Sequence, residues 1–253
     1  MNFNNTTIDW NQVHHVINGA NRIMLTTHEN PDGDGLGAEC GLYHHLNGIG
    51  KDIRIVNFSP LPDEYDYLND GGIFECYEKD YHENWIKNVD LVIVFDVGDY
   101  VRIRTIVDAV KKHNLTTMNI DHHPHPNAHP FTHNIVDLSA AATGCMVYDY
   151  LKLFREEPIQ KESLVGIYSA VMTDTGCFRY SNTDQKCHNI AIECLSAGVE
   201  THIIYRQIYE NSTRSRMSLM GTFLSNLNYE LDGKLAWFTI SQTMLKNANA
   251  TKA

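Results

Sequence analysis

Several features that would assign the chain to other classes of protein are missing from it. None of its six cysteines forms a Cys-x-x-Cys pair, and the polar first 20 residues contain no apolar core of a secretion signal. We therefore expect reduced thiols in a cytoplasmic protein. No apolar run approaches the roughly 18 residues of a membrane-spanning helix, so the sequence predicts no membrane partner.

Basic residues are also scarce. Lys and Arg number 20 against 31 Asp and Glu, which gives a formal net charge of -11 over 253 residues. This balance disfavours tracking along a long nucleic acid, because non-specific affinity comes from basic side chains that neutralise phosphates. A short phosphorylated substrate stays compatible if metal ions supply positive charge locally. The hydrophobic content of 43% is enough for a sizeable core and excludes global disorder.

The first half of the chain alternates strand-like and helix-like segments. Short runs rich in Ile, Val, Leu and Met predict strands at residues 22–26, 52–58, 91–95, 116–120 and 134–136. Intervening segments predict helices at residues 35–47, 100–113 and 140–154. The strands are apolar along their length, as expected when helices cover both faces of a parallel sheet. The predicted fold class is α/β, with a mostly parallel, doubly wound sheet.

After residue 154 the strand signal fades. Helices are predicted at residues 160–171, 184–197, 200–209 and 215–229, and a β-rich run at Lys234–Ile240 follows the turn Asp232-Gly233. We interpret that run as the first strand of another unit, which the remaining residues cannot complete. The expected organisation is a main domain at residues 1–197, a helical linker at 198–230 and the start of an incomplete second α/β domain at 231–253.

Three potential metal ligands lie in one short stretch, at His28, Asp32 and Asp34. A predicted strand precedes them and a predicted helix follows, so they lie at the carboxyl end of a strand, where open α/β sheets bind ligands. On its own, the stretch is also compatible with an ordinary helix start in which Asp34 is the N-cap. Both readings stay open for this stretch considered alone.

Three further clusters accompany it. Asp96 ends one predicted strand, Asp121-His122-His123 ends another, and Asp174 follows an apolar helix. Parallel strands place their carboxyl ends at one edge of the sheet, so these side chains are expected to meet. Carboxylates combined with imidazoles suit Mn²⁺, Fe²⁺, Co²⁺ or Zn²⁺ rather than Ca²⁺. The set is too large for one tetrahedral ion, and it fits two ions sharing a carboxylate, which hydrolyse phosphate esters.

Each of the later clusters has an ordinary alternative. Asp96 or Asp174 alone would be compatible with a turn. The pair His122-His123 alone would be compatible with an ordinary polar loop. His125, His129 and His133, which follow the pair, are interpreted as solvated residues without a role. The occurrence of all four clusters together, at strand ends, favours a functional site.

The segments THENPDGDG, FDVGD, IDHHPH and MTDTG resemble the four signature motifs of the DHH phosphoesterase family. The triplet Asp121-His122-His123 gives that family its name, and the resemblance covers roughly residues 20–185, with matching order and spacing. Within the family, the run Thr173–Thr183 is most similar to the bacterial nanoRNase/pAp phosphatase group, an oligoribonuclease-like group. The resemblance implies that residues 1–197 are a catalytic DHH domain and that 231–253 begin a DHH-associated substrate-binding domain.

The resemblance also implies two divalent metal ions, with Mn²⁺ as the expected ion. One ion would be bound by His28 and Asp32 and the other by Asp34, His122 and Asp174, with Asp96 bridging the two.

Three residues are implied to act on or beside the substrate. His123 would face the substrate phosphate, and Arg179 would bind a phosphate group. Asp121 would accept a hydrogen bond from a ligating histidine and orient it. Asp96, His123 and Asp121 are therefore the predicted catalytic residues.

The predicted function is a two-metal phosphohydrolase. It would cleave short oligonucleotides (nanoRNA) to mononucleotides, 3′-phosphoadenosine 5′-phosphate (pAp) to AMP and phosphate, or both. The alternatives are a cyclic-dinucleotide phosphodiesterase, an inorganic pyrophosphatase, a single-strand exonuclease, or a non-catalytic metal- or nucleotide-binding module. The family's Gly-Gly-His element is missing, since the only Gly-Gly pair is Gly71-Gly72. A homodimer is one possible assembly.

Overall fold

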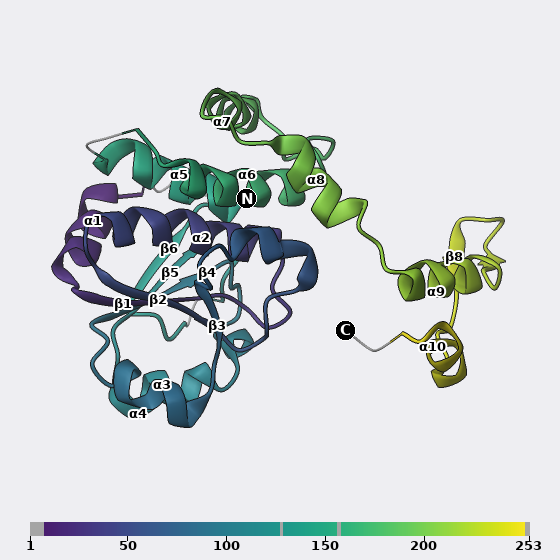
Figure 1. Ribbon diagram of the computed structural model, residues 1–253, viewed down its shortest axis with the longest axis horizontal. Coiled ribbons are helices and arrows are strands. Elements are labelled where there is room, and N and C mark those ends of the chain that lie inside the picture. The colour runs from purple at the N-terminus through teal and green to yellow at the C-terminus, as the bar shows by residue number, and fades with distance from the viewer. Residues whose placement is uncertain (1–7, 127–128, 156–157, 251–253) are drawn as a thin grey trace. The chain divides into compact units, whose positions relative to one another are not determined.

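The computed structural model describes residues 8–126, 129–155 and 158–250. It divides into two compact units, residues 1–204 and residues 205–253 (Figure 1). The elements up to the boundary are α1 (Trp10–Gly19), β1 (Arg22–Thr26), α2 (Gly33–Gly48), β2 (Asp52–Asn57), the 3₁₀ helix η1 (Asp63–Leu68), β3 (Phe74–Cys76), α3 (Lys79–Ile86), β4 (Leu91–Phe95), the 3₁₀ helix η2 (Tyr100–Ile103), α4 (Ile106–His113), β5 (Thr117–Asp121), β6 (His133–Val136), α5 (Thr143–Phe154), α6 (Lys161–Asp174), α7 (Gln185–Ser196) and α8 (Thr201–Tyr209), which crosses it.

The first unit is built on a six-stranded sheet with the order β3-β2-β1-β4-β5-β6. Every neighbouring pair of strands in it is parallel. The direction of winding reverses between β1 and β4, and the crevice beyond the carboxyl ends of such strands is where open α/β sheets bind ligands. The predicted fold class is thereby confirmed.

Helices cover both faces of the sheet, with α1, α2, α5 and α6 on one side and α3 and α4 on the other (Figure 1). Met24 and Val94 belong to the core cluster that includes Ile86 of α3 and Ile106 of α4. Leu25, the strand neighbour of Met24, is also fully buried and points to the opposite face, because successive strand residues alternate. Burial on both faces explains why these strands are apolar throughout.

Small residues let α2 and α6 pack with their backbones in close contact. A side chain at Gly37 would lie 2.3 Å from the carbonyl oxygen of Gly166 and 3.0 Å from Ala170 Cβ. Nearer the start of α2, a side chain at Gly33 would lie 2.5 Å from Thr173 Oγ1, near the end of α6. The two helices are therefore antiparallel, and the first turn of α2 lies beside the last turn of α6.

Several elements differ from the sequence prediction. Helices α1 and α3 and the three-residue edge strand β3 are additional. The predicted helix at 100–113 is split into η2 and α4, because Arg104 has a left-handed backbone with φ of 53°. That conformation is uncommon outside glycine and interrupts a helix.

The second unit contains α9 (Arg214–Leu224), β7 (Asn228–Glu230), β8 (Leu235–Trp237) and α10 (Gln242–Ala248). The helix predicted to run to residue 229 ends at Leu224, where Asn226 Nδ2 donates to the Thr222 carbonyl. The predicted strand at 234–240 is shorter and pairs antiparallel with β7, so it is the second strand of a hairpin. Of the helices described, none has the length and apolar character needed to cross a membrane.

Candidate active site

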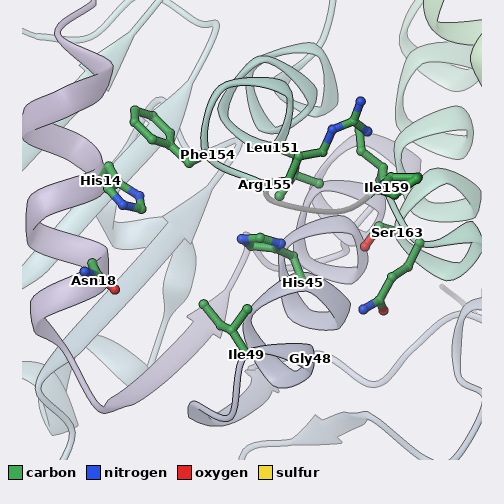
Figure 2. A pocket seen from close by; sticks show the side chains of 12 residues that line it. His14, Asn18, His45, Gly48, Ile49, Leu151, Phe154, Arg155, Ile159 and Ser163 are labelled. Atoms are coloured by element: carbon green, nitrogen blue, oxygen red, sulfur yellow. The ribbon is translucent and has the colours of Figure 1, made fainter.

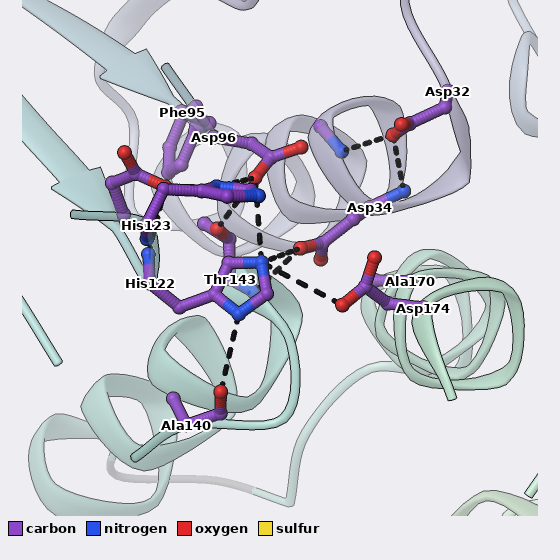
Figure 3. A network of polar contacts seen from close by, with 12 residues as sticks. Asp32, Asp34, Phe95, Asp96, His122, His123, Ala140, Thr143, Ala170 and Asp174 are labelled. Atoms are coloured by element: carbon purple, nitrogen blue, oxygen red, sulfur yellow. Dashed lines mark hydrogen bonds and ion pairs between the residues drawn. The ribbon is translucent and has the colours of Figure 1, made fainter. Parts of the chain in front are cut away.

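The expected site residues converge beyond the carboxyl ends of β1, β4 and β5. His28 follows β1, Asp96 follows β4, and His122 and His123 follow β5. The first turn of α2 and the last turn of α6 complete the site, because their close packing brings Asp34 and Asp174 together (Figure 3).

One group of potential ligands combines His28, Asp32 and Asp96. His28 Nε2 lies 3.5 Å from Asp96 Oδ2 and 3.8 Å from Asp32 Oδ2. The other nitrogen of the ring, Nδ1, lies 2.8 Å from the carbonyl oxygen of Glu29. That contact favours a proton on Nδ1 and leaves Nε2 free as a ligand.

Asp32 has a second role as the N-cap of α2. Its Oδ1 accepts hydrogen bonds from the backbone N–H groups of Asp34 and Gly35, while Oδ2 faces His28. The alternative reading of this stretch as a helix start was therefore partly right, although the cap is Asp32 rather than Asp34. One carboxylate both begins the helix and contributes an oxygen to the site.

A second group combines Asp34, His122 and Asp174. His122 Nε2 lies 3.4 Å from Asp34 Oδ2, 3.6 Å from Asp174 Oδ2 and 3.6 Å from Asp96 Oδ1. Its Nδ1 lies 3.1 Å from the carbonyl oxygen of Ala140, which fixes the ring orientation (Figure 3). The two oxygens of Asp96 thus face different histidines.

The residues present fit a bound cation. His122 Nε2 is buried yet has no hydrogen-bond partner, although three carboxylates surround it. The distances of 3.4–3.6 Å are long for hydrogen bonds. They match the spacing of about 3.4 Å between two atoms that each lie about 2.1 Å from one ion at a tetrahedral angle. A divalent cation would satisfy the nitrogen and neutralise the carboxylates.

Asp96 occupies the centre of the site in a strained conformation. It is 3% exposed and its φ of 56° lies in the left-handed region. Its Oδ1 lies 3.1 Å from His123 Nδ1 and 3.4 Å from Thr143 Oγ1. Backbone strain of this kind costs about 1–3 kcal/mol and persists at functional sites.

The carboxylates of the site repel one another in the absence of a cation. Burial, with Asp96 and Asp174 nearby, raises the pKa of Asp34 well above its ordinary value, even though Thr143 and Gly144 donate their N–H groups to it. Burial likewise raises the pKa of Asp174 to about 6. For Asp96, burial would raise the pKa, but hydrogen bonds from His123 and His28 outweigh it and hold the pKa well below its usual range.

His123 is held by two carboxylates. Its Nδ1 lies 2.9 Å from Asp121 Oδ1 and 3.1 Å from Asp96 Oδ1, and these contacts raise the pKa of His123 to about 10. The ring carries a positive charge at neutral pH, and its side chain is 48% exposed. Of the two paired histidines, Asp121 thus contacts the ring of His123, whereas the ring of His122, the expected ligand, is oriented by Ala140.

The interpretation of His125 as a solvated bystander was wrong. Its Nε2 lies 2.6 Å from Asp121 Oδ2, and its side chain is 6% exposed. Asn119 Nδ2 lies 3.2 Å from the same nitrogen. Asp121 therefore lies between two imidazoles. The signal in the sequence was the short separation between Asp121, at the end of β5, and His125, four residues later in the loop that follows.

A buried polar network beneath His28 was not predicted. Asn57 Oδ1 accepts the backbone N–H of Thr27, and Asn57 Nδ2 donates to Glu39 Oε2 at 2.9 Å. Thr27 Oγ1 donates to the carbonyl oxygen of Phe95 at 2.8 Å. The network ties the ends of β1, β2 and β4 together directly before His28 and Asp96. Burial raises the pKa of Glu39 well above its ordinary value, although a hydrogen bond from Asn57 acts in the opposite direction.

Two arginines lie near the site. Within the described residues, neither forms an ion pair with the carboxylates of the site. Arg102 Nη2 lies 3.0 Å from His28 Nδ1, but the two cannot share a hydrogen bond while Nδ1 donates its proton to the carbonyl oxygen of Glu29, because a guanidinium only donates. Arg179, the predicted phosphate ligand, is exposed and donates from Nε to the carbonyl oxygen of Gly176. It follows three successive left-handed residues, Gly176, Cys177 and Phe178, with φ of 56°, 60° and 61°. The signature-like sequence suggested Arg179, whereas nothing in the sequence marked Arg102.

The family model for the DHH family, N-terminal domain, matches residues 22–173, which contain five of the six expected metal ligands, all except Asp174. The chain belongs to the DHH family. The match starts at the first strand of the sheet and ends one residue before Asp174.

The chain is also similar to curated relatives and to a solved structure. The chain is 29% identical to the bifunctional oligoribonuclease and PAP phosphatase NrnA of Thermus thermophilus, over 84% of this chain and 61% of that protein. It is 26% identical to the protein of the same name from Bacillus subtilis, over 88% of this chain and 68% of that protein. The crystal structure of an exopolyphosphatase-related protein from Bacteroides fragilis superimposes with a TM-score of 0.89 at 26% identity, covering 96% of this chain and 72% of that one.

Proposed function

We propose that this DHH-family chain is a two-metal phosphohydrolase acting on short oligonucleotides, on 3′-phosphoadenosine 5′-phosphate, or on both. The observation that carries the proposal is the arrangement of Asp96. One of its oxygens faces His28 and the other faces His122, so a single carboxylate can bridge two ions. Asp32 would help to hold the first ion, and Asp34 and Asp174 would help to hold the second.

The ions would supply Lewis acidity and lower the pKa of water to near neutrality. The protein's own residues fix the geometry. The α5 N-terminus holds Asp34 through the N–H groups of Thr143 and Gly144. Ala140 holds His122, and the Thr27–Asn57 network holds the strand ends. Such outer contacts orient ligands and tune their basicity.

His123 is proposed to stabilise negative charge on the phosphoryl group. Its Nδ1 is the atom that contacts Asp121 and Asp96, so Nε2 is the ring nitrogen that can reach a substrate oxygen. A donor that is already oriented needs no reorganisation when charge develops. Asp121 orients His123 through Nδ1, and Arg179 is proposed to bind a second phosphate.

The substrate class rests on the relatives and on charge. Both NrnA relatives carry the names of an oligoribonuclease and a PAP phosphatase. A net charge of -11 suits a small substrate gripped at a local cationic centre better than a long polyanion. The chain spans 61% of the length of the NrnA relative from Thermus thermophilus. Binding of the part of the nucleotide that lies beyond the reacting phosphate is therefore also a proposal. The domain division at 197 and 230, Mn²⁺ as the ion, a homodimer and a cytoplasmic location likewise stay predictions.

A four-substrate assay tests the proposal. Purified protein with Mn²⁺ is given a diribonucleotide, 3′-phosphoadenosine 5′-phosphate, a cyclic dinucleotide and pyrophosphate in parallel, and the products are separated by chromatography. We expect mononucleotides from the first, AMP and phosphate from the second, or both. Exclusive cleavage of pyrophosphate or of the cyclic dinucleotide would assign the chain to another DHH activity. Metal binding without any turnover would favour the non-catalytic alternative.

A further inference from the structure

A cavity of about 430 Å³ lies at the other end of α2 from the candidate active site (Figure 2). It is lined by residues from α1, the end of α2, the end of α5 and the start of α6. Asp34 and Gly48 are 14 residues apart on α2, which corresponds to about 21 Å at 1.5 Å per residue. The volume is in the range of small-molecule sites, roughly 300–1,000 Å³.

The start of α6 borders this cavity with polar groups that lack hydrogen-bond partners from other side chains. The N-cap residue, Gln160, makes no side-chain hydrogen bond to the first turn of this 14-residue helix. In that first turn, Ser163 is 1% exposed and its hydroxyl has no hydrogen-bond partner. Figure 2 shows the hydroxyl directed toward the cavity. Backbone N–H groups without a side-chain cap and a buried hydroxyl at a helix N-terminus together favour an anion.

A cation lies beside the same end of the cavity. Arg155 lines it and reaches Glu193 through Nη1 at 3.4 Å. Glu193 has two closer partners, Tyr148 Oη at 2.6 Å and Lys152 Nζ at 2.8 Å. Arg155 can therefore turn toward an anion without leaving Glu193 unpaired. A guanidinium also suits phosphate geometrically, because it donates two parallel hydrogen bonds.

The rest of the lining suits a flat organic group. Phe154 stacks on His14, with ring centroids 4.1 Å apart and planes 6° apart, and Leu151 adds aliphatic surface. Burial lowers the pKa of His45, so its neutral ring can both donate and accept hydrogen bonds at pH 7. An aromatic wall beside neutral donors and acceptors fits a nucleobase.

We propose that this cavity is a second, non-catalytic site for a nucleoside monophosphate. The phosphate would bind at the α6 N-terminus between Ser163 and Arg155, and the base would lie against the Phe154 side of the cavity. The choice of AMP as the nucleotide rests on the proposed function, which would release it. Binding some 20 Å from the metal ligands would allow a product to act on the enzyme without competing for its active site.

The test is isothermal titration of AMP into the full chain in EDTA, which deprives the active site of divalent ions. We expect saturable binding of one AMP. Ser163→Ala should weaken it about 3- to 10-fold, as for the loss of a neutral hydrogen bond, and Arg155→Gln by more than about tenfold, as for a charged one. Asp174→Asn is the matched control in the active site and should leave the affinity unchanged. Adenosine and inorganic phosphate, titrated separately, should each bind more weakly than AMP.

Two results would overturn this assignment. One is the absence of AMP binding, and the other is binding that Asp174→Asn abolishes while Ser163→Ala and Arg155→Gln retain it. Circular dichroism confirms that each variant is folded. Arg155→Gln alone decides if Ser163→Ala does not fold, because Arg155 is partly exposed at the end of α5. A chain that hydrolyses none of the four phosphate substrates would defeat the proposed function and leave this titration intact.

Discussion

Replacing Asp174 with Asn should stabilise the metal-free protein at neutral and alkaline pH. The pKa of Asp174 is raised from 3.8 to about 6, first by burial and then by Asp96 and Asp32. Folding therefore takes up a proton between these two pH values, so stability falls as pH rises from about 4 to about 6 and stays reduced above that. Asn has no proton to lose and escapes this penalty.

The magnitude follows from the shift. About two pKa units correspond to about 3 kcal/mol at 1.36 kcal/mol per unit. The side chain is 30% exposed, so solvent screening reduces the expected gain to about 1–2 kcal/mol. The measurement is urea unfolding in EDTA at pH 4 and at pH 8, comparing the free energy of unfolding of variant and wild type. The difference should appear at pH 8 and nearly vanish at pH 4.

Asp70→Asn is the matched control, because Asp70 is exposed in the turn between η1 and β3. It should change stability little at either pH. With Mn²⁺ present the order should reverse, because bound ions stabilise the wild type by mass action. If Asp174→Asn destabilised the metal-free chain at pH 8, or changed its stability equally at both pH values, the reasoning about mutually repelling carboxylates would be wrong.

Three further predictions concern activity and packing. Asp96→Ala should abolish turnover of the preferred substrate in steady-state assays with Mn²⁺, and near-native activity would rule out a bridging carboxylate. His125→Ala should lower kcat about 10- to 100-fold, as for other outer contacts of metal sites, with KM and the number of bound ions unchanged; an unaltered kcat would show that Asp121 needs no second imidazole. Gly37→Ala should destabilise the protein by about 1–3 kcal/mol, because the new Cβ would meet the Gly166 carbonyl oxygen at 2.3 Å. Gly19→Ala, where nothing lies within 4 Å, is the control in thermal unfolding.

The sequence predicted the sheet and the location of the site because both depend on local patterns. Strands buried on both faces are continuous apolar runs, as in β4, whose five residues are all buried. The motifs with the candidate metal ligands follow such runs directly, so strand ends and candidate ligands were predicted together. The edge strand β3 was missed because it is only three residues long, Phe74–Cys76. Its residues are incompletely buried and form no apolar run.

Other features depend on tertiary contacts that no local pattern marks. Asn57 meets Glu39 from 18 residues away and Thr27 from 30. The left-handed backbone at Arg104 cannot be inferred from an arginine, which rarely adopts it. The same holds for Ser163, which belongs to a cavity only because α1, α2, α5 and α6 meet there. Sequence patterns located the chemistry, and the packing of helices determined what surrounds it.

The number of Mn²⁺ ions bound per chain tests the central claim most directly. Equilibrium dialysis of the wild type at pH 8 should give two ions per chain, because Asp96 offers one oxygen to each group of ligands. Asp32→Asn should weaken one of them and leave the other, and Asp96→Ala should weaken both. A wild type that binds a single ion, or two ions whose affinities Asp96→Ala leaves unchanged, would contradict a shared two-ion centre.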